Sequence, residues 1–194
     1  MTELDAYNRM LATLGESPVE SENEDHGSLP AARAQLSRTR QAVLGKGWWF
    51  NRENTTLTPD PESGYVSVPT DALSVEVVAS NLKYAQRGSR LYDSTNGTYV
   101  IPYAVAVRLL RDLEFTDLPF IAQEYIAAEA VAQFNIDNEG DPLKLREAQA
   151  VAKRAWFALF GEDLRQAKPN ILNRASTAVK INRIVGTSGR FYSR

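Results

Sequence analysis

The sequence contains no cysteine and a single histidine, His26, among 194 residues. Without cysteine the chain cannot form disulfides, thiolate zinc sites or a cysteine nucleophile. A catalytic triad or a histidine-centred metal site would have to use His26, which lies in the acidic stretch 20–27. A solvated loop is the better interpretation of that stretch. We therefore predict no catalytic residue, no cofactor and no metal.

Long apolar runs are also missing. No stretch approaches the roughly 18 residues that cross a bilayer, and the start at Met1–Asp5 is acidic, unlike a signal peptide. We expect no membrane insertion and no export by that route. No Walker-type glycine loop is present, which argues against nucleotide hydrolysis. Paired carboxylates for glycoside hydrolysis stay open, because 24 acidic residues allow many pairs, such as Glu53 with Asp60 or Glu62 beside aromatic residues.

Charge is distributed unevenly along the chain, although the net charge is only −2. From Lys168 to Arg194 there are six basic residues and no acidic one, so the preceding residues carry −8. This polar segment cannot bury enough apolar surface to offset the entropy of ordering. We expect residues 169–194 to form an extended C-terminal arm that becomes ordered on a partner. Its candidate contact residues are Arg174, Lys180, Arg183, Arg190 and Arg194.

Helical periodicity appears in four segments. The pattern predicts helices over residues 2–14 and 28–44, a third from Thr116 or Asp117 with Pro119 in its first turn, and a fourth from Asp141 to Gly161 or Ala167. Alanine dominates the middle of the third helix, which favours close approach of neighbouring helices and a central position in the bundle.

Between residues 48 and 111 the apolar period changes from helical to two residues. Turn residues such as Asn96-Gly97, a strong type I′ hairpin signal, separate short strand candidates. The candidates cover residues 55–57, 65–68, 74–79, 83–85, 90–92, 98–101 and 104–110, which predict an antiparallel meander. The fold class is therefore α+β. We expect an antiparallel bundle of about four helices (1–47 and 112–168), an inserted antiparallel β domain (48–111) and the extended arm (169–194).

The run Gly47-Trp48-Trp49-Phe50-Asn51 marks the change from helix to strand. Successive side chains of a strand alternate between faces, so three adjacent aromatics predict apolar surroundings on both. Trp48, Trp49 and Phe50 are therefore our candidates for a seam between layers or subunits, with a core strand of a monomer as the alternative. Tyrosines and arginines alternate over residues 84–92, where ordinary cross-strand pairing is favoured over a nucleic-acid face.

Several motifs follow one another in a definite order along the chain. Residues 10–19 and the aromatic run come first, and four further segments follow: Leu57-Thr58-Pro59-Asp60, Val68-Pro69-Thr70-Asp71-Ala72-Leu73, Arg87-Gly88-Ser89-Arg90-Leu91-Tyr92-Asp93 and Phe115-Thr116-Asp117-Leu118-Pro119. This order resembles the tail tubular protein A family of short-tailed bacteriophages, and the resemblance covers roughly residues 4 to 160. The arm matches the family only in length and general polarity.

The resemblance implies a structural head-to-tail adaptor of the virion, assembled in the host cytoplasm. Twelve copies would form a ring between the portal protein and the tail nozzle protein, tail tubular protein B, with DNA as a passing cargo. The basic arm would contact the portal or a neighbouring subunit. The alternative function is a tail-associated hydrolase of cell-envelope glycans. Residues 112–167 contain eleven acidic and five basic residues, and we expect carboxylates of this segment to face the channel, with solvation of the outer surface as the alternative.

Overall fold

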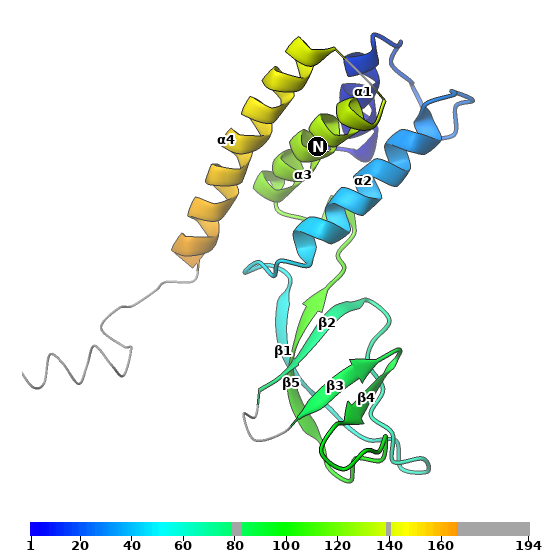
Figure 1. Ribbon diagram of the computed structural model, residues 1–194, viewed down its shortest axis with the longest axis vertical. Coiled ribbons are helices and arrows are strands. Elements are labelled where there is room, and N and C mark those ends of the chain that lie inside the picture. Colours follow the sequence, from blue (N-terminus) through cyan, green and yellow to red (C-terminus); the bar gives the residue numbers. More distant parts are fainter. Residues whose placement is uncertain (79–82, 139–140, 167–194) are drawn as a thin grey trace, which may run out of the picture.

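The computed structural model describes residues 1–78, 83–138 and 141–166 and combines four α-helices with antiparallel sheets (Figure 1). This confirms the α+β prediction. The helices are α1 (Glu3–Leu14), α2 (Leu29–Leu44), α3 (Phe120–Asp137) and α4 (Pro142–Gln166). The strands are β1 (Arg52–Leu57), β2 (Ala72–Val77), β3 (Tyr84–Arg87), β4 (Arg90–Asp93) and β5 (Val105–Arg111). The predicted arm lies outside the described residues.

The first two helices begin and end where local sequence signals predict. Thr2 caps α1, because its side chain accepts from the Asp5 amide while the Asp5 carboxylate accepts from the Thr2 amide. Gly15 ends α1 in the left-handed conformation, with φ of 77°. In α2, Pro30 occupies the first turn, but the Ser28 hydroxyl donates to Glu16 instead of capping the helix.

Helix α3 lies at the centre of the bundle and packs against α1, α2 and α4 (Figure 1). Its start differs from the prediction. A short 3-10 helix, η1 (Phe115–Asp117), comes first, and α3 begins at Phe120 with Pro119 as its N-cap. Leu118 is extended, with ψ of 148°, because the residue before a proline avoids the helical region. The central position of the third helix was predicted correctly.

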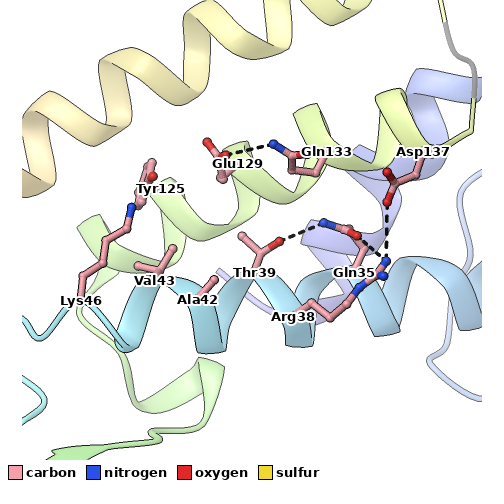
Figure 2. Close-up of a pocket in the computed structure, with 10 residues that line it drawn as sticks. All are labelled: Gln35, Arg38, Thr39, Ala42, Val43, Lys46, Tyr125, Glu129, Gln133 and Asp137. Atoms are coloured by element: carbon pink, nitrogen blue, oxygen red, sulfur yellow. Dashed lines mark hydrogen bonds and ion pairs between the residues drawn. The ribbon is translucent and has the colours of Figure 1, made fainter. Parts of the chain in front are cut away.

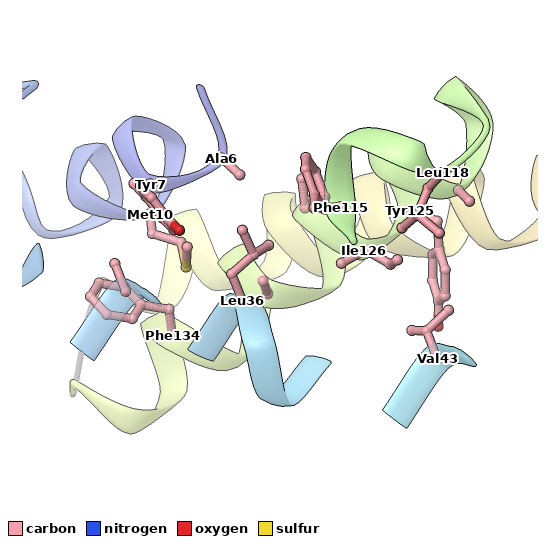
Figure 3. Close-up of a cluster of buried hydrophobic side chains, with 14 of the residues drawn as sticks. Ala6, Tyr7, Met10, Leu36, Val43, Phe115, Leu118, Tyr125, Ile126 and Phe134 are labelled. Atoms are coloured by element: carbon pink, nitrogen blue, oxygen red, sulfur yellow. The ribbon is translucent and has the colours of Figure 1, made fainter. Parts of the chain in front are cut away.

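The bundle core joins side chains from α1, α2, η1 and α3 (Figure 3). Tyr7 and Met10 of α1 face Leu36 of α2, and Phe134 of α3 packs in the same cluster. Small alanines fill many of the buried positions of α3, so neighbouring helices can approach it closely. Helix α4 packs along α3 but buries only Ala152 and Leu159.

The β part has its own hydrophobic cluster, and its topology is not the predicted meander. The last strand, β5, lies between β1 and β2 and is antiparallel to both, so the sheet order is β1-β5-β2. Val105, Val107 and Leu109 of β5 alternate with exposed residues and lie in this cluster. Strands β3 and β4 form a separate two-stranded sheet. The sequence pattern predicted strands in the regions of β1, β2 and β5 but not the order in which these strands pair.

Two predicted strands and one predicted turn are also corrected. Residues 65–68 and 98–101 take part only in isolated bridges. The hairpin at Asn96-Gly97 closes over four residues, from Asp93 to Thr98, and is therefore not a two-residue type I′ turn. The Asp93 carboxylate is the reason, because it accepts from the amides of Thr95 and Asn96 and so holds a wider loop.

The bundle and the β part are joined by two chain segments at one end of the bundle (Figure 1). Gly47 begins the first of these segments. Its φ is 73°, and a Cβ there would lie 2.9 Å from Leu110 Cδ2, so only glycine fits without strain. The close approach of Gly47 to β5 fixes where the chain leaves α2.

Candidate functional site

The aromatic run lies in a turn between α2 and β1, not in the predicted strand. Trp48 is 3% exposed, and its indole Nε1 donates to the Val43 carbonyl at 2.8 Å. Its ring meets Trp156 of α4 edge-on, with centroids 5.4 Å apart. The turn forms because Gly47 has positive φ and the Asn51 side chain accepts from the Trp48 amide at 2.8 Å.

Trp49 and Phe50 are half-buried, and their rings meet edge-on at 4.8 Å. The Trp49 amide donates to Asp163 of α4 at 2.9 Å. The run therefore connects the end of α2 to the C-terminal half of α4, beside the β part. The role of these residues between subunits stays a proposal.

Helix α4 exposes a row of large apolar side chains. Phe157 is 61% exposed, Phe160 43% and Leu164 47%, and their spacing of three and four residues places them on one side of the helix. Trp156 stacks on Phe160, with centroids 6.0 Å apart and planes 14° from parallel. We call Trp156, Phe157, Phe160 and Leu164 the α4 strip. An exposed apolar surface of this kind marks an interaction site in a folded protein.

Two adjoining pockets form a groove over α3. One, of about 370 Å³, lies between α2 and α3 (Figure 2), the other, of about 280 Å³, lies between α3 and α4, and they share Tyr125, Glu129 and Gln133 of α3. Lys46 lies 4.7 Å from the centre of the Trp156 ring and so connects the groove to the α4 strip.

The polar side chains of the groove are occupied with one another. Arg38 of α2 donates to Gln35 at 2.6 Å and lies 3.6 Å from Asp137 of α3. Burial, and secondarily the charge of Glu129, raises the pKa of Tyr125 to about 12, so this phenol stays protonated at neutral pH. The groove thus offers shape and hydrogen-bonding groups but no activated nucleophile.

Two of the three carboxylates considered for glycan hydrolysis, Glu53 and Asp60, have a structural partner. Glu53 accepts from the Arg111 guanidinium at 2.7 Å, and this hydrogen bond lowers the pKa of Glu53. Asp60 accepts from the Ser63 amide and hydroxyl at 2.8 Å, which lowers its pKa as well. A general acid for glycoside hydrolysis needs a raised pKa, so the environments of both groups disfavour that role.

The single histidine, His26, contacts neighbouring residues of its loop through both ring nitrogens. His26 Nδ1 accepts from the Ser28 amide at 3.3 Å, and Nε2 lies 3.9 Å from Glu16. Residues 20–25 beside it are exposed, as predicted for a solvated loop. Among the residues that the structure describes, no three His, Asp or Glu side chains are placed to share a metal ion. None of the described helices is both long and apolar enough to cross a membrane.

Tyrosines and arginines gather on the β3–β4 hairpin. Tyr92 lies opposite Ala85 in the ladder, and its ring instead contacts the diagonal neighbour Arg87, whose guanidinium carbon is 3.6 Å from the ring centroid. Arg90 is similarly placed over Tyr65, at 4.5 Å. Periodicity along residues 84–92 could not indicate that Tyr65, from a distant segment, joins this group. The five arm residues Arg174, Lys180, Arg183, Arg190 and Arg194 lie outside the described residues.

The described residues thus form an α+β chain with an exposed apolar side on α4 and an exposed arginine–tyrosine surface on the β3–β4 hairpin. A family model described as "Tail tubular protein" matches residues 4–180, and the chain belongs to this family. The chain is 33% identical over 168 residues to Tail tubular protein A of Klebsiella phage KP34. The matched region covers 87% of this chain and 90% of the phage KP34 protein. The protein is thus a structural component of a phage tail and is located in the virion. The family resemblance predicted from sequence motifs is confirmed.

Proposed function

We propose that this tail protein is a head-to-tail adaptor that forms a ring of twelve copies. The ring joins the portal protein to the tail nozzle protein, tail tubular protein B, and DNA passes through its centre during ejection. The α4 strip is the observation that carries this proposal. A subunit of a closed ring needs a lateral surface that is apolar and exposed in the single chain.

The energetics of the α4 strip favour its burial against a neighbouring subunit. Phe157, Phe160 and Leu164 each expose about half of their surface. Complete burial of such a side chain is worth about 1.5–3 kcal/mol, so burying the exposed half contributes about 1 kcal/mol each. The contact is repeated at every subunit, and closure of the ring makes the contacts cooperative.

We also propose that three parts of the chain have different roles in the ring. The helical bundle, residues 1–47 and 112–168, forms the wall of the ring, and the β insert, residues 48–111, forms a separate domain. The two hydrophobic clusters, one in the bundle and one in the β part, support this division. The basic arm, residues 169–194, contacts the portal or the neighbouring subunit through Arg174, Lys180, Arg183, Arg190 and Arg194. Trp48, Trp49 and Phe50 form a seam between layers or subunits, with Trp48 in the bundle core and the half-buried Trp49 and Phe50 available to a neighbour.

The channel of this ring should carry acidic or neutral side chains, since clustered lysine and arginine would bind phosphates and slow the DNA. Residues 112–167 have eleven acidic and five basic residues, and the exposed carboxylate of Glu114 lies in this segment. DNA is then a cargo and not a ligand. The assembled protein is expected to show negligible binding to duplex DNA at physiological salt, measured by fluorescence anisotropy.

The experiment that tests the proposal is native mass spectrometry of the full chain with and without portal protein. The wild type should form a twelve-subunit ring that binds the portal. A Phe157→Ser/Leu164→Ser variant should stay monomeric and folded, because it removes exposed apolar surface but no buried side chain. The matched control is Phe120→Ser, a 65% exposed aromatic outside the α4 strip, which should assemble normally.

Three results would contradict the proposal. One is a wild-type chain that forms no ring with or without portal. Another is an α4 variant that assembles as the wild type does. The third is clearing of peptidoglycan or capsule by the purified protein, which would favour the hydrolase alternative, since we propose a protein without enzymatic activity.

A further inference from the structure

The β3–β4 sheet lies at the end of the molecule away from the bundle (Figure 1) and carries a connected group of cationic and aromatic side chains. We call this group the tip cluster and define it as Tyr65, Arg87, Arg90, Tyr92 and Tyr99. Tyr99 connects the other two rings, with centroids 5.0 Å from Tyr92 and 6.4 Å from Tyr65. With Arg87 over Tyr92 and Arg90 over Tyr65, the five side chains form one continuous row.

The two guanidinium groups take part in no ion pair among the described residues. Neither Arg87 nor Arg90 has a described carboxylate within 4.0 Å, whereas Arg108 pairs with Glu76 at 3.1 Å. Asp93, beside the cluster in β4, directs its oxygens to the turn at residues 94–97. Both arginines are exposed, and Tyr99 is 37% exposed. Among the described residues, two guanidiniums without a carboxylate partner therefore lie over aromatic rings at an exposed surface.

We propose that the tip cluster is a docking surface for another virion protein that presents carboxylates. A guanidinium lying over an aromatic ring keeps its N–H donors free in its own plane, and these match the two oxygens of a carboxylate. Tyrosine and arginine are also the residues that most often dominate protein–protein binding, since they supply large contact area with few free rotations. Neither the ring nor the portal contact is needed for this docking.

The geometry favours a protein over a nucleic acid. Bases bind single-strand-binding proteins by stacking on open aromatic faces, but Arg87 and Arg90 already cover a face of Tyr92 and of Tyr65. Residues 48–111 contain six basic and six acidic residues, so this segment has no net positive charge to favour a phosphate backbone. Two guanidiniums suffice for one or two carboxylates on a protein surface.

The test is photo-crosslinking in intact phage particles, in which the chain occupies its natural place. A benzoylphenylalanine replaces Tyr99 by amber suppression, the particles are irradiated, and crosslinked peptides are identified by mass spectrometry. The expected product joins position 99 to a peptide of another virion protein that contains Asp or Glu. Crosslinks to DNA, to a second copy of this chain or to a peptide without an acidic residue would overturn the proposal, as would the absence of any crosslink.

Matched arginine variants then test the charge. With the crosslinker in place, Arg87→Ala/Arg90→Ala should lower the crosslink yield about tenfold, because interface arginines are among the residues whose truncation weakens binding most. Arg108→Ala, which removes an exposed arginine paired within the sheet, should leave the yield unchanged. Arg87→Lys/Arg90→Lys covers the case in which the alanine variant yields no particles. Its yield must fall too, because lysine lacks the planar fork, and an unchanged yield would overturn the proposal.

Discussion

Two hydrogen bonds join Asn51 and Arg111 where the bundle meets the β part. The Asn51 side chain donates to the Arg111 carbonyl at 3.0 Å, and the Arg111 amide donates to the Asn51 carbonyl at 2.9 Å. The same Asn51 amide nitrogen donates to the Leu44 carbonyl at 2.9 Å, and its oxygen accepts from the Trp48 amide. One buried side chain therefore connects the end of α2, the aromatic turn and the end of β5.

Replacing Asn51 by alanine should destabilise the protein by about 3 kcal/mol. Asn51 is 2% exposed, so its loss leaves the buried Trp48 amide and the Arg111 carbonyl without this partner, while the Leu44 carbonyl keeps the Gly47 amide at 3.0 Å. Urea unfolding of the purified chain measures the effect. Asn54→Ala is the control, because Asn54 is exposed and accepts only one long hydrogen bond, at 3.4 Å from Arg108, so its change should stay within about 0.5 kcal/mol. Equal losses in the two variants would contradict the role of Asn51.

Substitution of Trp48 should mainly affect folding, whereas substitution of Trp49 should mainly affect assembly. Trp48→Ala should cost about 3–5 kcal/mol, since it empties a buried site between Val43 and Trp156. Trp49→Ala affects a half-buried ring and should leave the chain folded but weaken ring formation, if the run is the seam between subunits. Thermal unfolding and native mass spectrometry report the two effects separately. A folded and fully assembling double variant would refute the prediction.

The turn at residues 94–97 should lose stability in acid. Hydrogen bonds from Asn96 and Thr95 lower the folded pKa of Asp93 below its ordinary value of 3.8. The stabilisation is therefore complete at pH values above 3.8 and is lost as the pH falls through the lowered folded value. Hydrogen exchange at the Thr95 and Asn96 amides should accelerate over that range. In Asp93→Asn these amides should exchange faster at neutral pH with no acid transition, and an identical acid transition in the variant would assign the effect to another group.

Truncation after Pro169 should weaken portal binding, most strongly at low salt. The segment from Lys168 to Arg194 carries six positive charges and the preceding chain −8, so an exposed basic arm should bind an acidic surface electrostatically. Its attraction weakens with salt, because the Debye length falls from about 10 Å at 0.1 M to about 3 Å at 1 M. A full-length chain with its five arm arginines and lysines replaced by glutamine is the control for length. Portal binding that is unchanged by truncation at low salt would refute the role of the arm.

Local signals in the sequence predicted the helices well. The capping box of Thr2 and Asp5 and the glycine after Leu14 act within a few residues of α1, so its ends can be read from the sequence. The start of α3 was predicted too early, since the extended residue before Pro119 keeps the 3-10 turn outside the helix. Local chemistry thus decided both the successes and this error.

The pairing of strands and the candidate surfaces depend on contacts between distant residues. The position of β5 between β1 and β2 follows from packing of the whole β cluster, which no turn signal specifies. The tip cluster unites Tyr65 and Tyr99 with the β3–β4 hairpin in the same way. The α4 strip could have been found on a helical wheel, since apolar residues of α4 occupy a second side besides the one that packs on α3.

Electron cryo-microscopy of the full chain mixed with portal protein tests the central claim most directly. The account predicts a twelve-subunit ring on the portal, with Phe157, Phe160 and Leu164 buried against the neighbouring subunit and a central channel lined mainly by acidic and neutral side chains. A portal without a ring would contradict it. So would a ring in which these three side chains face solvent, or one whose narrowest passage is lined mainly by lysine and arginine.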